Sequence, residues 1–309
     1  MLNLNKVKTY SLKKRYSKVR AGDSARPPAK RRSFRSFFKG LPDVLKAREL
    51  REVVKAVITA HRKRRPVILM CGAHVIKCGL NPVVIHLLKK GVINCLCLNG
   101  AGIIHDYELA LQGETSEDVA HSLHDGSFGM ARETADFINS AGRDGVREGL
   151  GLGYAVAGRI ASSRLKHKNE SLLYNAYTRG VPVCVFVAVG TDIIHQHPSF
   201  DAALTAQGSL RDFHTLTGMV GRLDKGGVVL NFGSAVILPE VFLKALNLAR
   251  NTGARVADFT TANFDMIYHY RPAQNVVTRP VSSGGKGYYL IGHHEIMLPL
   301  FAQAVCEEI

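Results

Sequence analysis

Two kinds of apolar spacing alternate along the chain, and together they predict alternating helices and strands. Between Pro42 and Arg64 apolar side chains recur every three or four residues, the period of a helix with one buried face. Elsewhere, short continuous apolar runs end at or near glycine, which is typical of strands buried on both faces. We expect such strands at Pro66–Cys71, Val92–Leu98, Val181–Val189, Gly227–Asn231, Arg255–Thr260 and Gly287–Gly292.

The segments between the expected strands carry the helical period. We expect helices through Val83–Leu88, over most of 103–180, over 239–250 and from about Glu295 onward. Continuous apolar strands separated by helices indicate a parallel sheet covered on both faces. Residues 41–309 are therefore predicted to form one α/β domain with a doubly wound parallel sheet.

Residues 1–40 differ from the rest in composition. Residues 1–39 hold 13 of the 41 Lys and Arg residues and one acid, Asp23, so most of the net charge of +16 lies there. We predict a flexible basic arm, with Phe34, Phe37 and Phe38 able to tether its end to the domain. A solvated tail, docking onto a neighbouring subunit and nucleic-acid binding remain open. Nucleic acid is the least favoured, because no aromatic-rich basic surface follows the arm.

The six cysteines lie mostly in the apolar runs, and none forms a CxxC pair. Cys95 and Cys97, two residues apart, would share one face of a strand. We interpret the cysteines as reduced, buried thiols of a cytoplasmic protein. No run of 18 or more apolar residues is present, so no membrane span is predicted, and the basic N-terminus lacks the apolar region of a secretion signal.

Four of the expected strands end in the same way, with an apolar run, a glycine and then a small or polar residue. In open α/β sheets ligands bind outside the carboxyl ends of the strands, where glycine lets the backbone approach a phosphate. Ordinary turn chemistry is the alternative for each glycine. The spacing G-x-G-x-x-G is absent, which disfavours an ordinary Rossmann dehydrogenase. The four segments are MCGAH (70–74), LNGAG (98–102), AVGTD (188–192) and NFGSA (231–235).

These segments lie within longer motifs that resemble the deoxyhypusine synthase family. The resemblance implies a Rossmann-like fold and a homotetramer that binds NAD and spermidine at subunit interfaces. It also implies an activity: spermidine is oxidised, and its aminobutyl group passes through an imine on an enzyme lysine to a lysine of a translation factor. The motifs are GAHVIKCG (72–79), NGAGIIHDYELALQGET (99–115), GTDIIHQHP (190–198) and GSAVILPE (233–240).

The resemblance also assigns the residues that would bind NAD. Asp106 replaces the family's glutamate that holds ribose hydroxyls, and Thr261, Ala262 and Asp265 match a segment after the family's fifth strand. The full set of NAD candidates is Gly72, Ala73, His74, Asn99, Gly100, Ala101, Gly102, Asp106, Gly190, Gly233, Ser234, Thr261, Ala262 and Asp265.

The amine side of the family's site is altered in this sequence. GTDIIHQHP stands where the family has an Asp-Gly-Ser turn, and an ungapped register places Pro280 at the catalytic lysine. Lys286 could replace that lysine only if its loop is rearranged. We therefore predict that the chain does not make deoxyhypusine.

Histidines are numerous, and His195 and His197 form an HxH pair beyond a strand. We expect His195, His105 and Asp192 to form the catalytic side of the site, with an imidazole as general base on a substrate amine. HxH with carboxylates can also bind zinc or iron, and structural hydrogen bonding is the plain alternative. No metal ligand is assigned.

Together these features predict an NAD-dependent enzyme that acts on a small amine or polyamine by transient oxidation to an imine and group transfer. Two alternatives remain. One is a metal-dependent hydrolase that uses the histidine cluster. The other is a non-catalytic scaffold that keeps the nucleotide site.

Overall fold

The computed structural model describes residues 2–309 and contains one six-stranded sheet, all of whose pairings are parallel. The strand order is β3-β2-β1-β4-β5-β6, the doubly wound order of a Rossmann-like fold. This confirms the predicted fold class. The strands are β1 (Val67–Cys71), β2 (Cys95–Asn99), β3 (Val183–Phe186), β4 (Val228–Phe232), β5 (Thr260–Asp265) and β6 (Lys286–Ile291).

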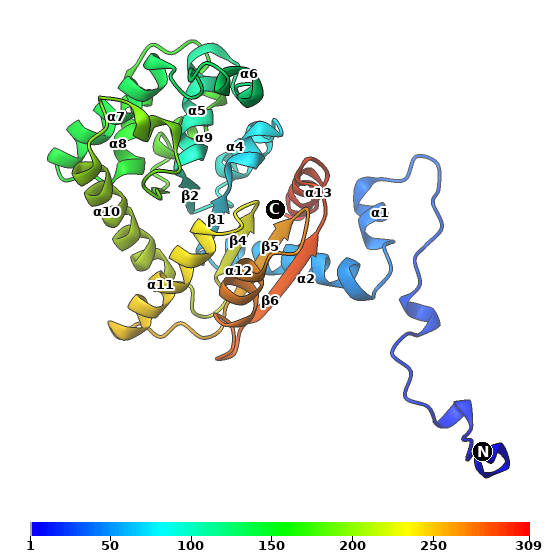
Figure 1. Ribbon diagram of the computed structural model, residues 1–309. Helices are drawn as coiled ribbons and strands as arrows, with labels where there is room; N and C mark the ends of the chain where they lie inside the picture. The colour runs from blue at the N-terminus through cyan, green and yellow to red at the C-terminus, as the bar shows by residue number, and fades with distance from the viewer. Residues whose placement is uncertain (1) are drawn as a thin grey trace.

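Helices cover both faces of the sheet (Figure 1). One face packs against α2, α4, α5, α8, α9 and α13, and the other packs mainly against α10 and α11. Because successive side chains of a strand point to opposite faces, β1, β2, β3 and β4 each contribute to both cores. The helices are α1 (Phe34–Lys39), α2 (Leu45–Arg62), α3 (Ala73–Lys77), α4 (Asn81–Lys89), α5 (Gly100–Gln112), α6 (Val119–Leu123), α7 (Arg132–Arg147), α8 (Leu152–Ser162), α9 (Leu172–Tyr177), α10 (Ala202–Val220), α11 (Ile237–Asn251), α12 (Tyr270–Pro272) and α13 (His294–Cys306).

The fifth strand lies later than the sequence pattern predicted. The expected strand Arg255–Thr260 is mostly loop, and β5 begins at Thr260. β5 was missed because it lacks a continuous apolar run: several of its side chains are polar, yet they are buried and hydrogen-bonded inside the protein. Thr261 Oγ1 donates to the carbonyl of Val276 (2.6 Å), and Asn263 Oδ1 accepts from Asn231 Nδ2 (2.6 Å).

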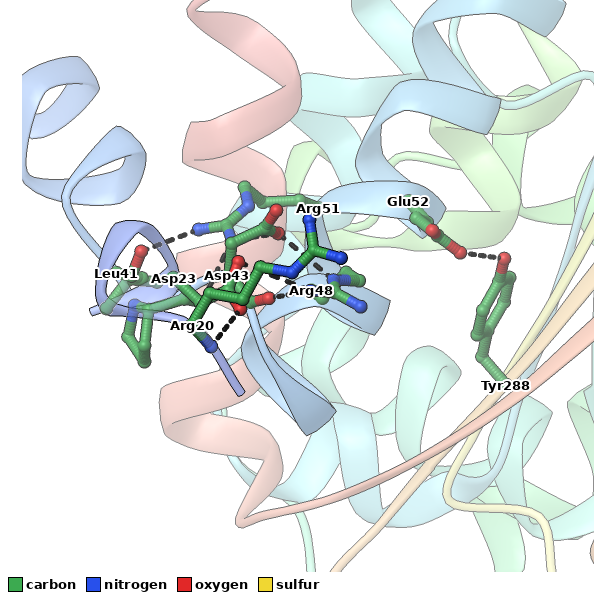
Figure 2. A network of polar contacts seen from close by, with 9 residues as sticks. Arg20, Asp23, Leu41, Asp43, Arg48, Arg51, Glu52 and Tyr288 are labelled. Atoms are coloured by element: carbon green, nitrogen blue, oxygen red, sulfur yellow. Dashed lines mark hydrogen bonds and ion pairs between the residues drawn. The ribbon is translucent and has the colours of Figure 1, made fainter. Parts of the chain in front are cut away.

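The N-terminal arm projects from the domain as an exposed segment with a few short 3-10 turns (Figure 1). Its end is attached: Phe38 joins the main core and Phe34 packs against that core, whereas Phe37 stays exposed. The predicted boundary at residue 40 therefore assigns α1 to the arm, although α1 packs on the domain. Figure 2 shows the region of a second attachment, in which Asp43 N donates to the Asp23 carbonyl (2.8 Å).

The cysteines agree with the prediction of reduced thiols. All six are free: Cys71, Cys95, Cys97 and Cys184 are buried, and the other two are half-buried. Among residues 2–309 no helix combines the length and the apolar character needed to cross a membrane.

Candidate functional site

A cavity of about 580 Å³ lies beside α5, which begins directly after β2. Helix α5 contributes Ala101, Ile104, His105, Glu108 and Gln112 to its wall. These positions follow the helical period, so one face of α5 lines the cavity while the opposite face enters the core. The turn after β3, the 114–119 segment and the loop before α7 complete the wall.

The cavity wall is rich in carboxylates. Glu108, Glu114, Glu117 and Asp192 line it, and Lys77 is the one basic side chain besides His105 among its lining residues. Glu114 is exposed, and Glu117 accepts a hydrogen bond from the Gly129 amide (2.9 Å). Four carboxylates against one ammonium favour a cationic ligand.

A hydrogen-bond chain fixes the state of His105. The Thr115 hydroxyl donates to Glu108 Oε2, so Thr115 Oγ1 accepts from His105 Nδ1 (2.7 Å). In the neutral imidazole the proton is thus on Nδ1, and Nε2 keeps its lone pair. Burial raises the pKa of Glu108, but hydrogen bonds from His105, Thr115 and Thr134 outweigh it and lower that pKa. The Glu108 carboxylate, acting through Thr115, therefore orients the His105 ring and leaves the lone pair of the neutral imidazole on Nε2.

Asp192 occupies the amino end of α5. A side chain at Gly100 would meet the Asp192 carboxylate at 1.9 Å, and the Ala101 amide donates to that carboxylate. The free N–H groups at a helix amino end attract an anion, and here the protein supplies its own. Burial raises the pKa of Asp192 to about 6, and the Ala101 amide only partly opposes this.

His195 does not take the predicted place on the cavity wall. Its side chain is 4% exposed and packs beside Phe200, with ring centroids 4.5 Å apart. Its Nδ1 accepts from the amides of Gly190 (3.1 Å) and Asp192 (3.3 Å), so a neutral ring carries its proton on Nε2. Burial lowers the pKa of His195 and keeps the ring neutral. His195 Nε2 lies 3.7 Å from Asp192 Oδ2, so His195 contacts Asp192 from behind and does not line the cavity, and its catalytic role stays a prediction.

The position of Asp106 does not suit its predicted role in ribose binding. It faces away from the cavity and is fully buried, because one step along α5 turns the side chain by about 100°. Burial raises its pKa to about 6, although four donors partly offset the effect. Its carboxylate accepts from Ser171 Oγ (2.6 Å), the amides of Leu172 (2.6 Å) and Leu173 (3.1 Å), and Asn81 Nδ2 (3.2 Å). Asp106 therefore holds the start of α9 in place.

At the crevice between β1 and β4, where the strand order reverses, two glycines pack closely against their neighbours. A side chain on Gly72 would lie 2.0 Å from the Gly233 carbonyl oxygen, and one on Gly233 would lie 2.8 Å from His294 Nε2. His294 is buried, and its ring lies 5.7 Å from that of His74. Ala73 begins the short α3 beside them. Only glycine fits at positions 72 and 233, because a side chain at either would clash with the neighbouring turn or with His294.

The remaining turn candidates make bonds within the chain. Asn99 caps α5 by accepting from the Gly102 amide (3.0 Å). Ser234 is buried, and its hydroxyl accepts from the Leu238 amide (3.3 Å). Gly190 has a φ of 92° and open space on its side-chain face, so among these turns the one after β3 leaves room.

Two NAD candidates, Thr261 and Ala262, and the candidate lysine lie elsewhere than predicted. Thr261 and Ala262 are buried within β5 and do not follow it, while Asp265 ends that strand. Lys286 is the first residue of β6, at the amino ends of the parallel strands and therefore opposite the cavity. Lys286 therefore cannot act in the α5 cavity in this conformation.

The histidine cluster considered for a metal does not assemble. His197 Nε2 is bonded to the Gly129 carbonyl (2.8 Å), and His105 is engaged with Thr115. Within the described residues 2–309, the one group of three or more potential ligand atoms close together is Cys95, Cys97 and Cys184. The ligand geometry therefore disfavours a metal-dependent hydrolase built on these histidines.

Sequence reasoning missed Glu108, Thr115 and Glu117. The signal for Glu108 was present, because it follows His105 by three residues and so lies on the same helical face. Thr115 and Glu117 lie on a loop after α5 that folds back over the helix, and spacing does not predict such a return.

No family model matches the chain, and no curated protein matches it. Solved structures do. AgrE in its ternary complex with ornithine and NAD⁺ is 14% identical, with a TM-score of 0.52 over 87% of this chain and 34% of AgrE. A proposed LOR/SDH protein from Methanococcus maripaludis S2 is 14% identical, with a TM-score of 0.51 over 91% of this chain and 74% of that one.

A proposed deoxyhypusine synthase from Entamoeba histolytica is 9% identical, with a TM-score of 0.49 over 89% of this chain and 93% of that one. That score is too low to carry an argument. At these identities the AgrE and LOR/SDH structures support the Rossmann-like fold alone. The chain spans about a third of AgrE.

Proposed function

We propose that this chain is an enzyme that binds a small amine or polyamine as a cation in the α5 cavity and removes a proton from it. One observation carries the proposal: a cavity of about 580 Å³ is lined by four carboxylates together with an imidazole whose Nε2 is free to accept a proton. The carboxylates would bind the protonated amine, and the imidazole would remove its proton.

The residues divide the work between recognition and proton transfer. Glu114 and Glu117 lie in the loop after α5 and supply negative charge to hold an ammonium group. Glu108 acts through Thr115 to keep the His105 proton on Nδ1. His105 Nε2 then accepts a proton from the amine, which leaves the nitrogen lone pair available for reaction.

NAD remains the proposed cofactor, and group transfer through an imine remains the proposed reaction class. The motif resemblance supports both, and AgrE was solved with ornithine and NAD⁺. In the present conformation the Asp192 carboxylate lies against Gly100 at the start of α5. Proton transfer at His105 uses the cavity as it stands, whereas NAD phosphates at this turn would have to displace Asp192. A cytoplasmic location likewise stays a prediction.

Two rival functions are less well supported. The hydrolase lacks an assembled set of histidine ligands within residues 2–309. A scaffold does not need a base with a fixed tautomer beside clustered carboxylates. Deoxyhypusine synthesis is not expected, because Lys286 lies at the far edge of the sheet and Pro280 replaces the lysine of the family motif.

Calorimetry with 1,4-diaminobutane tests the proposal. The wild-type chain should bind the diamine, and the double variant Glu114→Gln, Glu117→Gln should bind it about tenfold more weakly. That factor corresponds to about 1.4 kcal/mol, a reasonable loss for two partly exposed charges. Glu148→Gln is the control, since Glu148 is exposed outside the cavity. No binding by the wild-type chain at millimolar diamine would refute the proposal.

Chemical modification gives a second, independent readout. Diethylpyrocarbonate acylates unprotonated imidazole nitrogens, so His105 should be modified and 1,4-diaminobutane should protect it. His195 should react slowly, because its side chain is 4% exposed. Peptide mass spectrometry that found His105 unreactive, or equally reactive with and without the diamine, would argue against His105 as the base.

A further inference from the structure

Three thiols meet inside the sheet, away from the proposed amine site. Cys95 and Cys97 are two residues apart on β2 and point to the face covered by α10 and α11. Cys184 on β3 is the register partner of Cys97. All three side chains are fully buried, and their sulfur atoms lie within 4.8 Å of one another, with Cys95 and Cys97 3.9 Å apart.

This spacing matches that of a trigonal metal site. A thiolate–metal bond of about 2.3 Å places three sulfurs in a plane about 4.0 Å apart. The Cys95–Cys97 pair already has this separation, at 3.9 Å. The strands set it, because residues i and i+2 share a face and Cys97 pairs in register with Cys184. A metal would thus need little movement of the backbone.

We propose that Cys95, Cys97 and Cys184 form a buried trithiolate site for a monovalent copper ion. Soft thiolates select copper(I) and zinc, but a structural zinc almost always takes four ligands. The nearby carboxylate of Asp212 is not within 4.8 Å of all three sulfurs, and its Oδ2 accepts from the amides of Gly153 and Val185 (both 2.8 Å). The hydrophobic residues packed around the three sulfurs and the softness of the thiolates favour copper(I).

The protons balance without any change of oxidation state. Each cysteine that becomes a ligand exchanges its S–H bond for a Cu–S bond and releases its proton, and copper stays monovalent. Because the cluster is closed to solvent, we expect the ion to enter while the chain folds.

The test uses the full chain, refolded without oxygen in the presence of a thiol-free reductant and one equivalent of copper(I). We expect one copper to remain on each chain after exchange against bicinchoninate, and X-ray absorption should show three sulfur neighbours at about 2.3 Å. Cys184→Ser and Cys97→Ser should each lower the affinity for copper(I) at least tenfold. Cys71→Ser is the matched control, since Cys71 is equally buried on β1 but packs in the other core.

Several results would overturn the proposal. They are no copper retained by the wild-type chain, the same loss in Cys71→Ser as in Cys184→Ser, a coordination shell without three sulfurs, or a Cys97–Cys184 disulfide as the stable state of the wild-type chain under the same reducing conditions. If a cysteine variant does not refold, the stoichiometry and sulfur shell of the wild-type chain decide the question. The outcome does not depend on the amine proposal, because the two sites share no residue.

Discussion

His105 and Asp106 are neighbours in the sequence but have unrelated surroundings. His105 lies on the cavity face of α5, and Asp106 lies on the core face, where four donors hold its carboxylate. A sequence motif that contains both residues invites a shared function, but the helical period separates them. The contacts of each side chain, and not its neighbour in the sequence, determine what it can do.

Buried carboxylates make the stability of this protein depend on pH. Burial raises the pKa of Asp212 from the usual 3.8 to about 7. Between those values the folded chain holds a proton that the unfolded chain has released, so the free energy of unfolding falls as the pH rises. The raised pKa of Asp212 corresponds to at most roughly 4 kcal/mol, at about 1.4 kcal/mol for each unit.

Asp212→Asn should therefore flatten this dependence. Urea unfolding of the wild-type chain should give a lower free energy of unfolding at pH 8 than at pH 5, and the difference should shrink in the variant. It should not vanish, because the pKa values of Asp106 and Asp192 are raised in the same direction. Asp136→Asn, at an exposed position on α7, should behave like the wild type. An unchanged difference in Asp212→Asn would contradict the assignment.

Helix α5 determines what can bind at the carboxyl end of β2. Its amino end offers the free N–H groups that attract a phosphate, but the Asp192 carboxylate lies against Gly100 there. Asp192 would thus compete with the phosphates of NAD at this turn. Gly100 leaves space at the start of α5, and Asp192 from the loop after β3 fills that space.

Asp192→Ala should remove this competition and raise the affinity for NAD at least tenfold, as measured by calorimetry. The direction follows from the loss of a negative charge and from the space opened beside Gly100. Asp136→Ala is the control because it changes the same charge at an exposed site. Equal affinities for NAD in the two variants would show that the nucleotide does not use this turn.

The molecule exposes several apolar side chains next to the carboxyl edge of the sheet. Beyond β5, Ile267, Tyr268 and Tyr270 are each at least 60% exposed. A cluster of this kind is a common feature of a surface that a partner covers. It supports the proposal that the chain forms a homotetramer, or at least a dimer. We predicted that nucleic-acid binding is the least favoured role of the basic arm, and this stays a prediction.

Light scattering at micromolar concentration should find an assembled species, and Ile267→Arg should shift it towards the monomer. Burying a charge at an apolar contact is costly, which sets the direction of the shift. Leu210→Arg on α10 is the control, since Leu210 is a similarly exposed apolar residue on a different element. A monomeric wild-type chain would rule out the proposed assembly.

The pattern of the sequence was sufficient for most of the fold. Continuous apolar runs and helical periods predicted five of the strands near their observed places and the covering of both sheet faces, because burial on both sides requires such runs. The pattern failed at β5, where buried polar side chains interrupt the apolar run and bond to Asn231 on β4 and to the Val276 carbonyl. It also predicted that Cys95 and Cys97 share a face, but their meeting with Cys184 depends on the pairing of β2 with β3.

The candidate site was decided mainly by the tertiary structure. The sequence named His105 and Asp192, which both line the cavity, but it also named His195, Asp106 and Lys286, which do not. Local spacing states which residues share a helix face or follow a strand. It does not state which loop returns over a helix, which carboxylate fills a turn, or at which edge of the sheet a lysine lies. Those outcomes depend on contacts between residues far apart in the chain, and only the assembled fold supplies them.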